Sequence, residues 1–556
     1  MNSTQRSYRP LRWCNKCRIP LLGNHCENCG SPGHVICSDL KPMWKEEVKF
    51  VEKRIGKMFP GRNWQDGLWM RYRTIWFQGE RLLRLHCSSN LKIVGRYPVS
   101  MEAGIQAAPI TKNILYKGNK SFLEKLQKEA ISFIRQTVKK FPKKKPIVSI
   151  SGGKDSAVVS FLVAKALRPK KISYMFADTT MEYPDTYNYI KRFMKKNRKS
   201  TLYKASSPKA FFEMCKIIGP PSRLNAWCCS VFKSSPIARL VQQINGNQGI
   251  ISFEGIRRKE SIRRRNRERL YESKKVACQL SAYPILDWRE ADVWIYILTK
   301  GIDFNDAYRK GFNRVGCMFC PNNVSYNEYL MWVYYLKYVR KWKYFLLNYA
   351  RKIGKKDIND YVSSGAWKMR IGRGKGENLE FAKKVPCFKK TTAMHFILDQ
   401  KIKEDFAERF KPFGHLTEFT DVSSKGFIVK DVSTKESLFM IKKVLDISIL
   451  KQESRIDPSW KLDGEFLCVD ILTSKSSYLL SKRIEKQIRK YQVCVLCGAC
   501  AGICPRHAIS VDSVYRINEE RCNNCGRCLT TKYLRDSCIS LHANLQTKRY
   551  RNGNRI

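Results

Sequence analysis

Two pairs of cysteines have the residue type and the spacing of a metal site. The pairs Cys14-x2-Cys17 and Cys26-x2-Cys29 are separated by eight residues. Each pair can direct two thiolates at one ion, and tetrahedral zinc in structural sites takes four such ligands. The spacing therefore predicts a zinc site on Cys14, Cys17, Cys26 and Cys29, with a mononuclear iron site as the alternative.

A second group of cysteines follows the spacing of a bacterial two-cluster ferredoxin. The first run is Cys494-x2-Cys497-x2-Cys500-x3-Cys504, followed by a proline, and the second run is Cys522-x2-Cys525-x2-Cys528, with Cys538 after nine further residues. In such proteins three cysteines of a run bind one 4Fe-4S cluster and the fourth binds the other cluster. This crossover predicts two ligand sets, namely Cys494, Cys497, Cys500 and Cys538, and Cys522, Cys525, Cys528 and Cys504.

A glycine-rich loop lies where a strand pattern changes into a helix pattern. The β-branched run of residues 147–150 precedes Ser151-Gly152-Gly153-Lys154-Asp155-Ser156, and helical periodicity follows over residues 157–167. Backbone N–H groups in such a turn attract phosphate, and Lys154 adds a positive charge. A second strand pattern at residues 172–177 completes a β-α-β unit, which predicts an α/β fold with a parallel sheet. A glycine turn without a ligand is the alternative.

This loop resembles the PP-loop of the ATP pyrophosphatase (adenine nucleotide alpha hydrolase-like) superfamily, whose members cleave ATP between the α- and β-phosphates and adenylylate a substrate. It does not fit the Walker pattern, which needs four residues between its glycines. Further motifs resemble the phosphoadenosine phosphosulfate (PAPS) reductase family over roughly residues 146–321, about a third of the chain. They are Asp178-Thr179-Thr180-x-Glu182-x-Pro184-x-Thr186, Cys228-Cys229 with Lys233 and Pro236, Gly255-Ile256-Arg257-Arg258-Lys259-Glu260-Ser261 with Arg264, Tyr283-Pro284-Ile285-x-Asp287-Trp288, and Gly316-Cys317-x2-Cys320.

The resemblance implies an adenine nucleotide site and three catalytic residues. Lys154 is expected to neutralise charge as pyrophosphate leaves, and Asp155 or Asp178 is expected to hold magnesium between the phosphates. The expected nucleotide contacts are Ser151, Gly152, Gly153, Lys154, Asp155, Ser156, Arg257 and Arg264. Two departures favour ATP over a sulfonucleotide as substrate. The Glu-Cys-Gly nucleophile motif of PAPS and APS reductases is missing, and the loop keeps its lysine, as in members that use ATP.

Four more cysteines are expected to bind a third 4Fe-4S cluster beside the nucleotide. Cys228 and Cys229 are adjacent, so their side chains diverge by about 100° on a helix, which is awkward for chelating one ion. With Cys317 and Cys320 they resemble the Cys-Cys and Cys-x2-Cys ligands of the cluster in APS reductases and their relatives. A zinc site and simple buried thiols are the alternatives.

The charge balance indicates a polyanionic partner. The 556 residues include 105 Lys and Arg but only 48 Asp and Glu, which gives a formal net charge of +57. A self-repelling excess of this size favours nucleic acid as the partner. Between Arg257 and Lys275 ten residues are basic and three are acidic, which predicts a phosphate track, with a solvated helix face as the alternative.

Hydropathy gives no indication of a membrane partner. The sequence has no apolar stretch of 18 or more residues, and no apolar core of a secretory signal follows its first residues. We therefore expect a cytoplasmic protein. In that reducing compartment the 22 cysteines are expected to bind metal rather than to form disulfides.

These patterns divide the chain into six segments around a parallel-sheet PP-loop core. In order they are a zinc ribbon (1–38), a basic β-rich module that resembles PUA-type RNA-binding domains (39–112), the PP-loop domain (113–349), a basic mixed α/β connector (350–490), a ferredoxin-like α+β domain (491–545) and a basic tail (546–556). No function can be assigned to the connector from its residues.

The favoured hypothesis is an iron-sulfur enzyme that adenylylates a base carbonyl of RNA, with tRNA as the favoured acceptor, and replaces the oxygen with sulfur. It would use ATP with magnesium, one zinc ion and three 4Fe-4S clusters, with unknown donors of electrons and sulfur. The alternative is a reductase that uses ferredoxin-type electrons to release sulfite from APS or PAPS. That reaction leaves the basic charge and the intact loop unexplained. A DNA phosphorothioation component is a more distant alternative.

Overall fold

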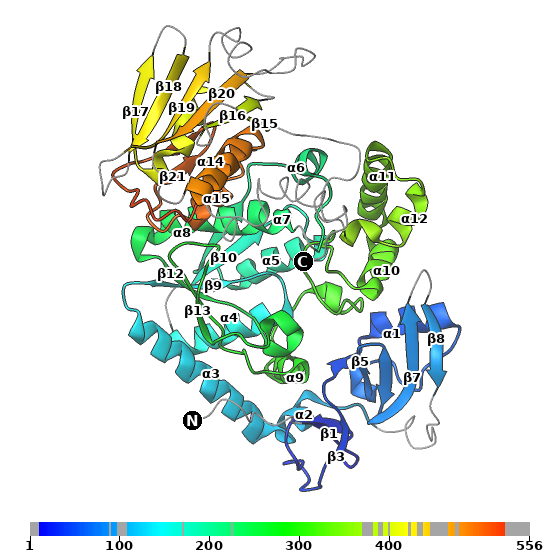
Figure 1. Cartoon of the computed structure of the whole chain (residues 1–556). Coiled ribbons are helices and arrows are strands. Elements are labelled where there is room, and N and C mark those ends of the chain that lie inside the picture. The colour runs from blue at the N-terminus through cyan, green and yellow to red at the C-terminus, as the bar shows by residue number, and fades with distance from the viewer. Residues whose placement is uncertain are drawn as a thin grey trace. The chain divides into compact units, whose positions relative to one another are not determined.

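The computed structural model divides the chain into two compact units (Figure 1). The first unit comprises Met1–Lys204, Gln248–Glu272 and Gln279–Trp342, and the second comprises Ala205–Asn247, Ser273–Cys278 and Lys343–Ile556. The residues that the structure describes are 10–87, 91–96, 108–168, 172–223, 226–369, 382–386, 393–398, 401–420, 424–430, 437–444, 465–472 and 477–528. Within these ranges no helix has the length and apolar character needed to cross a membrane.

Two small antiparallel sheets open the first unit. Their strand orders are β2-β1-β3 and β4-β5-β6-β7-β8. Arg84 and His86 of the long strand β7 are exposed while Leu83 and Leu85 are buried, so one face of its sheet packs on a core and the other meets solvent. The bounds are β1 (Leu11–Cys14), β2 (Ile19–Leu21), β3 (His34–Cys37), β4 (Lys41–Pro42), β5 (Leu68–Arg71), β6 (Thr74–Phe77), β7 (Glu80–Cys87) and β8 (Leu91–Arg96), with helix α1 (Lys45–Ile55) after β4.

The main sheet of the first unit has the order β11-β10-β9-β12-β14-β13. Strands β10 and β12 flank β9 in parallel, β14 continues in parallel, and β13 is antiparallel to β14. The strands are β9 (Lys145–Ser149), β10 (Ser173–Asp178), β11 (Thr201–Ser206), β12 (Ile250–Phe253), β13 (Leu270–Glu272) and β14 (Gln279–Ala282). This arrangement confirms the expected α/β fold with a parallel-sheet core.

The helices of this fold cover the sheet and lead the chain back to it. Helix α4 packs against β9 and against α3 and α9, and its residues from Ser156 to Val163 are nearly all buried. Such a central, apolar helix is typical of a doubly wound α/β fold. The helices are α2 (Lys112–Lys117), α3 (Lys120–Lys140), α4 (Lys154–Leu167), α5 (Pro184–Lys196), α9 (Glu290–Lys300) and α10 (Ser325–Tyr334).

The strand order places a topological switch point between β9 and β12. The chain moves from β9 to β10 on one side and returns later to β12 on the other side. Loops that follow two such strands diverge at their carboxyl ends and leave a crevice, which is where open α/β sheets bind ligands. The glycine-rich loop follows β9, so the fold places it at this crevice.

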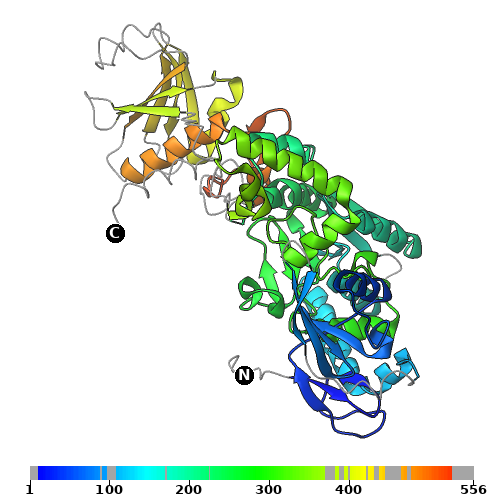
Figure 2. The same ribbon diagram turned by 90° about the vertical axis from the view of Figure 1, so that its right-hand side faces the viewer.

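The second unit contains a six-stranded antiparallel sheet of order β15-β16-β20-β19-β18-β17 (Figure 2). Phe396, Phe439 and Val469 of the sheet share a core with Ile484 and Ile488 of the long helix α14. The bounds are β15 (Ala382–Pro386), β16 (Ala393–Leu398), β17 (His415–Thr420), β18 (Ser424–Lys430), β19 (Ser437–Val444), β20 (Glu465–Ile471) and α14 (Ser477–Gln492). The segment that the sequence left without a function therefore has a hydrophobic core of its own.

The rest of the second unit is mainly helical. The short helix α15 packs on α8, where Ser235 donates a hydrogen bond of 3.0 Å to the Cys497 carbonyl. The elements are α6 (Phe211–Ile218), α7 (Trp227–Cys229), α8 (Ser235–Asn245), α12 (Ile358–Ser363), the 3-10 turn η8 (Glu404–Arg409), α15 (Ala499–Ile503) and the hairpin β21 (Ile509–Val511) with β22 (Tyr515–Ile517). Helix α11 (Leu336–Lys352) crosses the boundary between the units in sequence.

Candidate nucleotide and metal-binding sites

The glycine-rich loop joins the carboxyl end of β9 to the first turn of α4. Gly152 has a φ of +73°, a left-handed conformation that favours glycine, and a Cβ there would lie 2.7 Å from Cγ2 of Thr186. The Ser156 hydroxyl donates a hydrogen bond of 2.8 Å to the Gly153 carbonyl. These contacts hold the loop in a turn whose N–H groups can bind phosphate.

Lys154 is a buried cation at the start of α4, with only 4% of its surface exposed. Its Nζ lies 3.2 Å from a carboxylate oxygen of Asp155 and 3.3 Å from one of Glu290. Burial opposes the charge, but these carboxylates raise the pKa of Lys154 above its ordinary value. The loop therefore carries an ammonium group that is charged at neutral pH, the state expected of a group that meets phosphates.

Asp155 is held by Arg257, whose Nε lies 2.5 Å from its Oδ1. Although burial alone raises a carboxyl pKa, Arg257 and Lys154 lower the pKa of Asp155 to about 2. Gly255 makes the approach possible, because a Cβ there would lie 2.5 Å from the Asp155 carbonyl carbon. The loop after β12 is thus packed on the loop after β9, and Arg257 engages a carboxylate of the site.

Glu290 is itself positioned by Asp39, which precedes β4 in the sequence. The Asp39 carboxylate accepts hydrogen bonds of 3.0 Å from the Glu290 N–H and 2.7 Å from the Ala291 N–H. Burial and the nearby charge of Glu290 raise the pKa of Asp39 to about 6. Asp39 therefore anchors the first turn of α9, which carries the carboxylate that contacts Lys154.

Asp178, the last residue of β10, is also paired. One oxygen accepts hydrogen bonds of 2.8 Å from the Tyr187 hydroxyl and the Thr180 N–H, and the other lies 2.7 Å from Nζ of Lys204. Burial opposes ionisation, but the hydrogen bonds from Lys204, Thr180 and Tyr187 lower the pKa of Asp178 below its ordinary value. It is therefore a carboxylate at neutral pH, at the carboxyl edge of the sheet.

Several arginines of the basic segment from Arg257 to Lys275 make contacts within the first unit. Arg264 pairs with Glu260, and Arg258 lies 2.9 Å from Asp287. Arg267 donates to the Tyr283 hydroxyl at 2.8 Å, and Arg269 donates to the Pro284 carbonyl at 2.9 Å. The segment forms short turns rather than one helix. Arg264, an expected nucleotide contact, is thus engaged with a carboxylate of its own segment.

The first four cysteines converge on one point. The sulfur atoms of Cys14, Cys17, Cys26 and Cys29 all lie within 4.8 Å of one another. Arg18 and Gly30, which directly follow the two Cys-x2-Cys pairs, both have left-handed φ values of 56° and 73°. Two equivalent turns therefore present four thiols with the spacing that a single metal ion requires.

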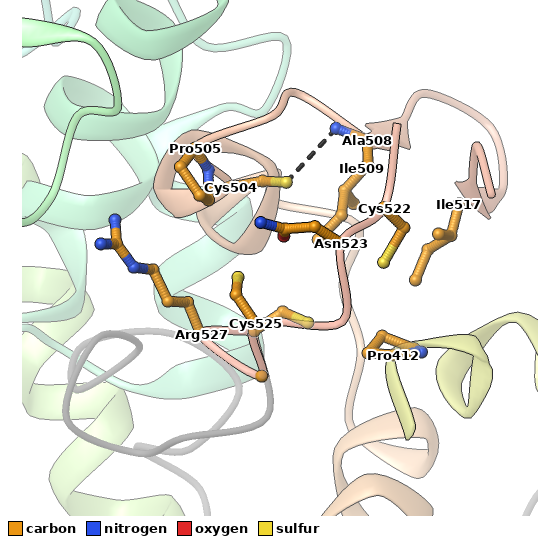
Figure 3. Close-up of a pocket in the computed structure, with 12 residues that line it drawn as sticks. Pro412, Cys504, Pro505, Ala508, Ile509, Ile517, Cys522, Asn523, Cys525 and Arg527 are labelled. Atoms are coloured by element: carbon orange, nitrogen blue, oxygen red, sulfur yellow. Dashed lines mark hydrogen bonds between the residues drawn. The ribbon is translucent and has the colours of Figure 1, made fainter. Parts of the chain in front are cut away.

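In the second unit, four cysteines of the C-terminal runs line one pocket (Figure 3). They are Cys504 from the first run and Cys522, Cys525 and Cys528 from the second run. Figure 3 shows Cys504 facing the turn that carries Cys522 and Cys525. The chain thus brings together the four residues that the crossover predicts for one cluster.

The two C-terminal runs share a backbone pattern. Leu496 and Gly498 of the first run have left-handed φ values, and so have Asn524 and Gly526 at the equivalent places of the second run. In the first run Cys497 and Cys500 are buried, and the Cys494 sulfur accepts a hydrogen bond of 3.0 Å from Nη2 of Arg409. Cys538, the expected fourth ligand of this set, and the basic tail lie outside the described residues.

The cysteines expected for the central cluster belong to different units. Cys228 and Cys229 lie in α7 of the second unit, and Cys317 and Cys320 lie in the first unit. Within the first unit the Cys317 sulfur is 3.5 Å from Thr179 Oγ1 and 3.5 Å from Glu182 Oε1. The loop that carries Cys317 is therefore joined to the loop after β10. The four-thiol site itself stays a prediction.

The sheet order and the glycine-rich loop with its lysine have the arrangement of an α/β domain that binds ligands at the carboxyl edge of its sheet. Residues 145–323 match the family of the phosphoadenosine phosphosulfate reductase domain. Two uncharacterised proteins of Methanocaldococcus jannaschii are similar, one 30% identical over 269 residues (47% of this chain, 53% of the relative) and one 35% identical over 208 residues (36% and 48%). The chain thus spans about half the length of each of these two relatives.

The adenosine 5'-phosphosulfate reductase of Shouchella clausii is 23% identical over 186 residues, which are 33% of this chain and 74% of that enzyme. Among solved structures, the PAPS reductase of Candida auris is 18% identical, with a TM-score of 0.27, over 36% of this chain and 95% of that chain. The NH3-dependent NAD synthetase of Campylobacter jejuni is 16% identical, with a TM-score of 0.25, over 46% and 99%.

Several residues of the sites were not predicted from the sequence. Glu290 and Lys204 contact the predicted Lys154 and Asp178, and Arg409 contacts the predicted Cys494. Glu290 opens a helix directly after the Asp287-Trp288 motif, and that position could have marked it. Lys204 and Arg409 belong to no motif, so no local signal could have indicated them.

Proposed function

We propose that this protein is an ATP-dependent enzyme that adenylylates a carbonyl oxygen of an RNA base, with tRNA as the favoured acceptor, and replaces that oxygen with sulfur. The proposal rests on Lys154, a buried ammonium group at the end of an intact glycine-rich loop. Its charge is balanced by the carboxylates of Asp155 and Glu290. An ATP phosphate can take the place of these carboxylates as the partner of the lysine. Such a preorganised charge stabilises the departure of pyrophosphate.

The reaction has two balanced steps. The carbonyl oxygen of the base attacks the α-phosphorus. The bond from this phosphorus to the oxygen that bridges the α- and β-phosphates breaks, and pyrophosphate leaves. A sulfide from an external donor then attacks the activated carbon, the bond from that carbon to oxygen breaks, and AMP leaves with the former carbonyl oxygen. If the donor is a persulfide, its sulfur–sulfur bond remains after the attack, and two electrons from the proposed C-terminal clusters would cleave it. The loop N–H groups and Lys154 orient the phosphates, while Arg257 keeps Asp155 ionised.

Magnesium would be held by Asp178 or Asp155 at the carboxyl edge of the sheet. The two residues differ in how easily their partners can leave. The Lys204 side chain is 59% exposed, whereas the Arg257 side chain that holds Asp155 is only 5% exposed. A cation can therefore displace Lys204 into solvent at lower cost, which favours Asp178 as the magnesium ligand.

The thiol sites would hold two kinds of cofactor. The site on Cys14, Cys17, Cys26 and Cys29 would hold zinc, because its four sulfur atoms have the closeness of a tetrahedral site. The two C-terminal sets would hold 4Fe-4S clusters that supply electrons, and Cys228, Cys229, Cys317 and Cys320 would hold the cluster that binds the sulfur.

RNA binding is supported by the overall charge of +57 and by the exposed face of the five-stranded sheet. Arg84 and His86 project from β7 to solvent, and Lys92 opposite His86 is exposed as well. Tyr72, between β5 and β6, is 81% exposed, with the Arg71 guanidinium 5.4 Å from its ring centre. Cations beside an exposed aromatic ring suit a nucleic acid strand, whose phosphates pair and whose bases stack.

A direct test is anaerobic turnover of the cluster-loaded protein with ATP, a sulfide source and tRNA from cells that lack the protein. We expect AMP and pyrophosphate in equal amounts and a thiolated nucleoside by mass spectrometry of the digested tRNA. Release of ADP and phosphate would contradict adenylylation.

Sulfonucleotide reduction is the second candidate, because residues 145–323 match the PAPS reductase domain and an APS reductase is 23% identical over 186 residues. APS or PAPS would lie on the same loop, and two electrons would reduce its sulfur to sulfite. Formation of sulfite from APS or PAPS without ATP would favour this candidate over RNA thiolation.

A further inference from the structure

The turn η8 connects the six-stranded sheet domain to the hairpin β21–β22 of the second unit through hydrogen bonds. Asp405 accepts a hydrogen bond of 3.4 Å from the Tyr515 N–H, and Glu408 accepts one of 2.7 Å from the Ile517 N–H. Lys411, just after the turn, pairs with Glu408 at 2.7 Å. The sheet domain therefore supplies a turn that lies along β22 and reaches the first cysteine run.

Arg409, the last residue of this turn, directs its guanidinium at a predicted cluster ligand. Its Nη2 lies 3.0 Å from the sulfur of Cys494, and its guanidinium carbon lies 3.6 Å from the centre of the Tyr515 ring. Only 2% of Arg409 is exposed. Its Nε and Nη1 have no hydrogen-bond partner, and no carboxylate among the described residues pairs with it.

A buried cation without a carboxylate partner is costly unless another negative charge lies nearby. The Cys494 thiolate, as part of a 4Fe-4S cluster, would provide that charge. The Nε and Nη1 groups of Arg409, which have no hydrogen-bond partner, are further donors close to the proposed cluster. Besides the Tyr515 ring, whose face attracts a cation, an anionic cluster on the first run would balance the charge of Arg409.

The second run has a different environment. The buried cation Lys490 donates a hydrogen bond of 2.7 Å to the main-chain carbonyl of Cys528 rather than to a sulfur. Cys525 of this run is exposed, whereas Cys497 and Cys500 of the first run are buried. The second run therefore has an exposed cysteine, whereas the first run has two buried cysteines and a third that contacts a guanidinium.

We propose that Arg409 raises the reduction potential of the cluster on the Cys494 run, so that this cluster accepts electrons from the more exposed cluster on the Cys522 run. The inference rests on the proposed electron-carrying role of these sites. Reduction of a 4Fe-4S cluster from the 2+ to the 1+ state adds one electron and no proton. A cation and hydrogen bonds at a ligand sulfur stabilise that added negative charge, and low local polarity strengthens the effect.

The test is a redox titration of the cluster-loaded full-length protein, followed by electron paramagnetic resonance under anaerobic conditions with dithionite as reductant. In Arg409→Gln we expect the reduced-to-oxidised ratio of one cluster, at a fixed potential, to fall at least tenfold, which corresponds to about 59 mV for one electron. The other cluster should keep its potential. The control is Arg516→Gln, which removes the same charge from an exposed position of β22 next to Tyr515, and no shift is expected there.

Iron content and thermal unfolding of each variant separate a change in potential from a loss of the cluster. If Arg409→Gln fails to incorporate the cluster, Arg409→Lys provides the test, because its ammonium keeps the charge but reaches the sulfur less well, and the potential must still fall. An unchanged potential in a loaded Arg409 variant would overturn the inference and leave the proposed function intact. Absence of this cluster from the wild-type protein would overturn both the inference and the cofactor assignment.

Discussion

Glu290 lies 3.3 Å from the ammonium group of Lys154, although the two residues come from opposite ends of the nucleotide-binding domain in sequence. The contact brings the first turn of α9 against the first turn of α4. It also makes Lys154 part of a group of four charges with Asp155 and Arg257, in which positive and negative charges balance. An incoming phosphate therefore meets a lysine that is already charged and already oriented.

Removal of that lysine should strongly reduce the proposed adenylylation without unfolding the domain. In Lys154→Ala we expect AMP release to fall by about 10²- to 10³-fold, the usual effect of removing one preorganised stabilising group. The matched control is Lys165→Ala at the exposed end of the same helix, which should retain activity. Thermal unfolding of both variants should show the folded state, and equal AMP release by the two variants would count against the loop assignment.

Gly255 is required where the loop after β12 approaches the loop after β9. In Gly255→Ala the new methyl group would lie 2.5 Å from the Asp155 carbonyl carbon and 2.6 Å from the Ser156 nitrogen, so the backbone must shift. We expect a destabilisation of about 1–3 kcal/mol and a loss of ATP affinity by calorimetry. Gly23→Ala, where nothing lies within 4 Å of the new Cβ, should change neither quantity.

Asp39 should make stability depend on pH in an unusual direction. Because the pKa of Asp39 is raised to about 6 in the folded state, its favourable contribution is complete below the unfolded pKa and is lost as the pH rises through about 6. Asp39→Asn removes this titration. The unfolding free energy of the wild type should therefore fall relative to that of the variant between about pH 4 and 6, by at most about 1.4 kcal/mol per pH unit. A constant difference between the two proteins would contradict the raised pKa.

Metal content distinguishes the three kinds of thiol site. The protein purified without oxygen should contain on the order of twelve iron atoms and one zinc ion per chain. Cys14→Ser should lower zinc and leave iron unchanged, while Cys228→Ser with Cys229→Ser should lower iron by about four atoms. About eight iron atoms in the wild type, unchanged in the double variant, would remove the central cluster.

RNA binding should show the salt dependence of a protein that neutralises phosphates. With six to ten phosphate contacts, the affinity for tRNA should fall by roughly 10³ to 10⁵ between 50 and 200 mM salt. Arg84→Gln with Lys92→Gln should reduce this slope, because both side chains are exposed on the five-stranded sheet. Arg258→Gln is the control, since that side chain is engaged with Asp287. A slope that stays the same in the double variant would place the RNA elsewhere.

Local chemistry explains which parts of the sites could be predicted from the sequence. Metal-binding turns and the phosphate loop need fixed spacings within a few residues, so Cys14, Cys26 and Lys154 stand in recognisable patterns. The partners of these residues come from distant segments, as Glu290 does for Lys154, and no periodicity encodes such a contact. Arg257 and Arg264 show the converse, since their positions in a motif do not reveal that each meets a carboxylate.

In the fold, too, local features could be predicted from the sequence, whereas contacts between distant segments could not. The β-branched run before the loop predicts β9 and its parallel sheet, because strand, glycine turn and helix are consecutive. The connector segment has strands such as β16, with buried Met394, Phe396 and Leu398 in alternation. One neighbour of β16 is β15, which comes just before it in sequence, but the other is β20, which lies far along the chain, and the core includes α14 further on. Pairing over such separations depends on tertiary packing, which single-sequence patterns do not contain.

The pocket that Cys504 shares with the second cysteine run has a consequence for biosynthesis. All four thiols of the N-terminal site lie within one short stretch, so a metal ion can bind as soon as that stretch has left the ribosome. The pocket of Cys504, by contrast, is complete only when Cys528 has been synthesised. If this pocket holds the proposed cluster, its loading would be a late step, and a chain that ends before the second run would carry Cys504 as a thiol without its partner cysteines.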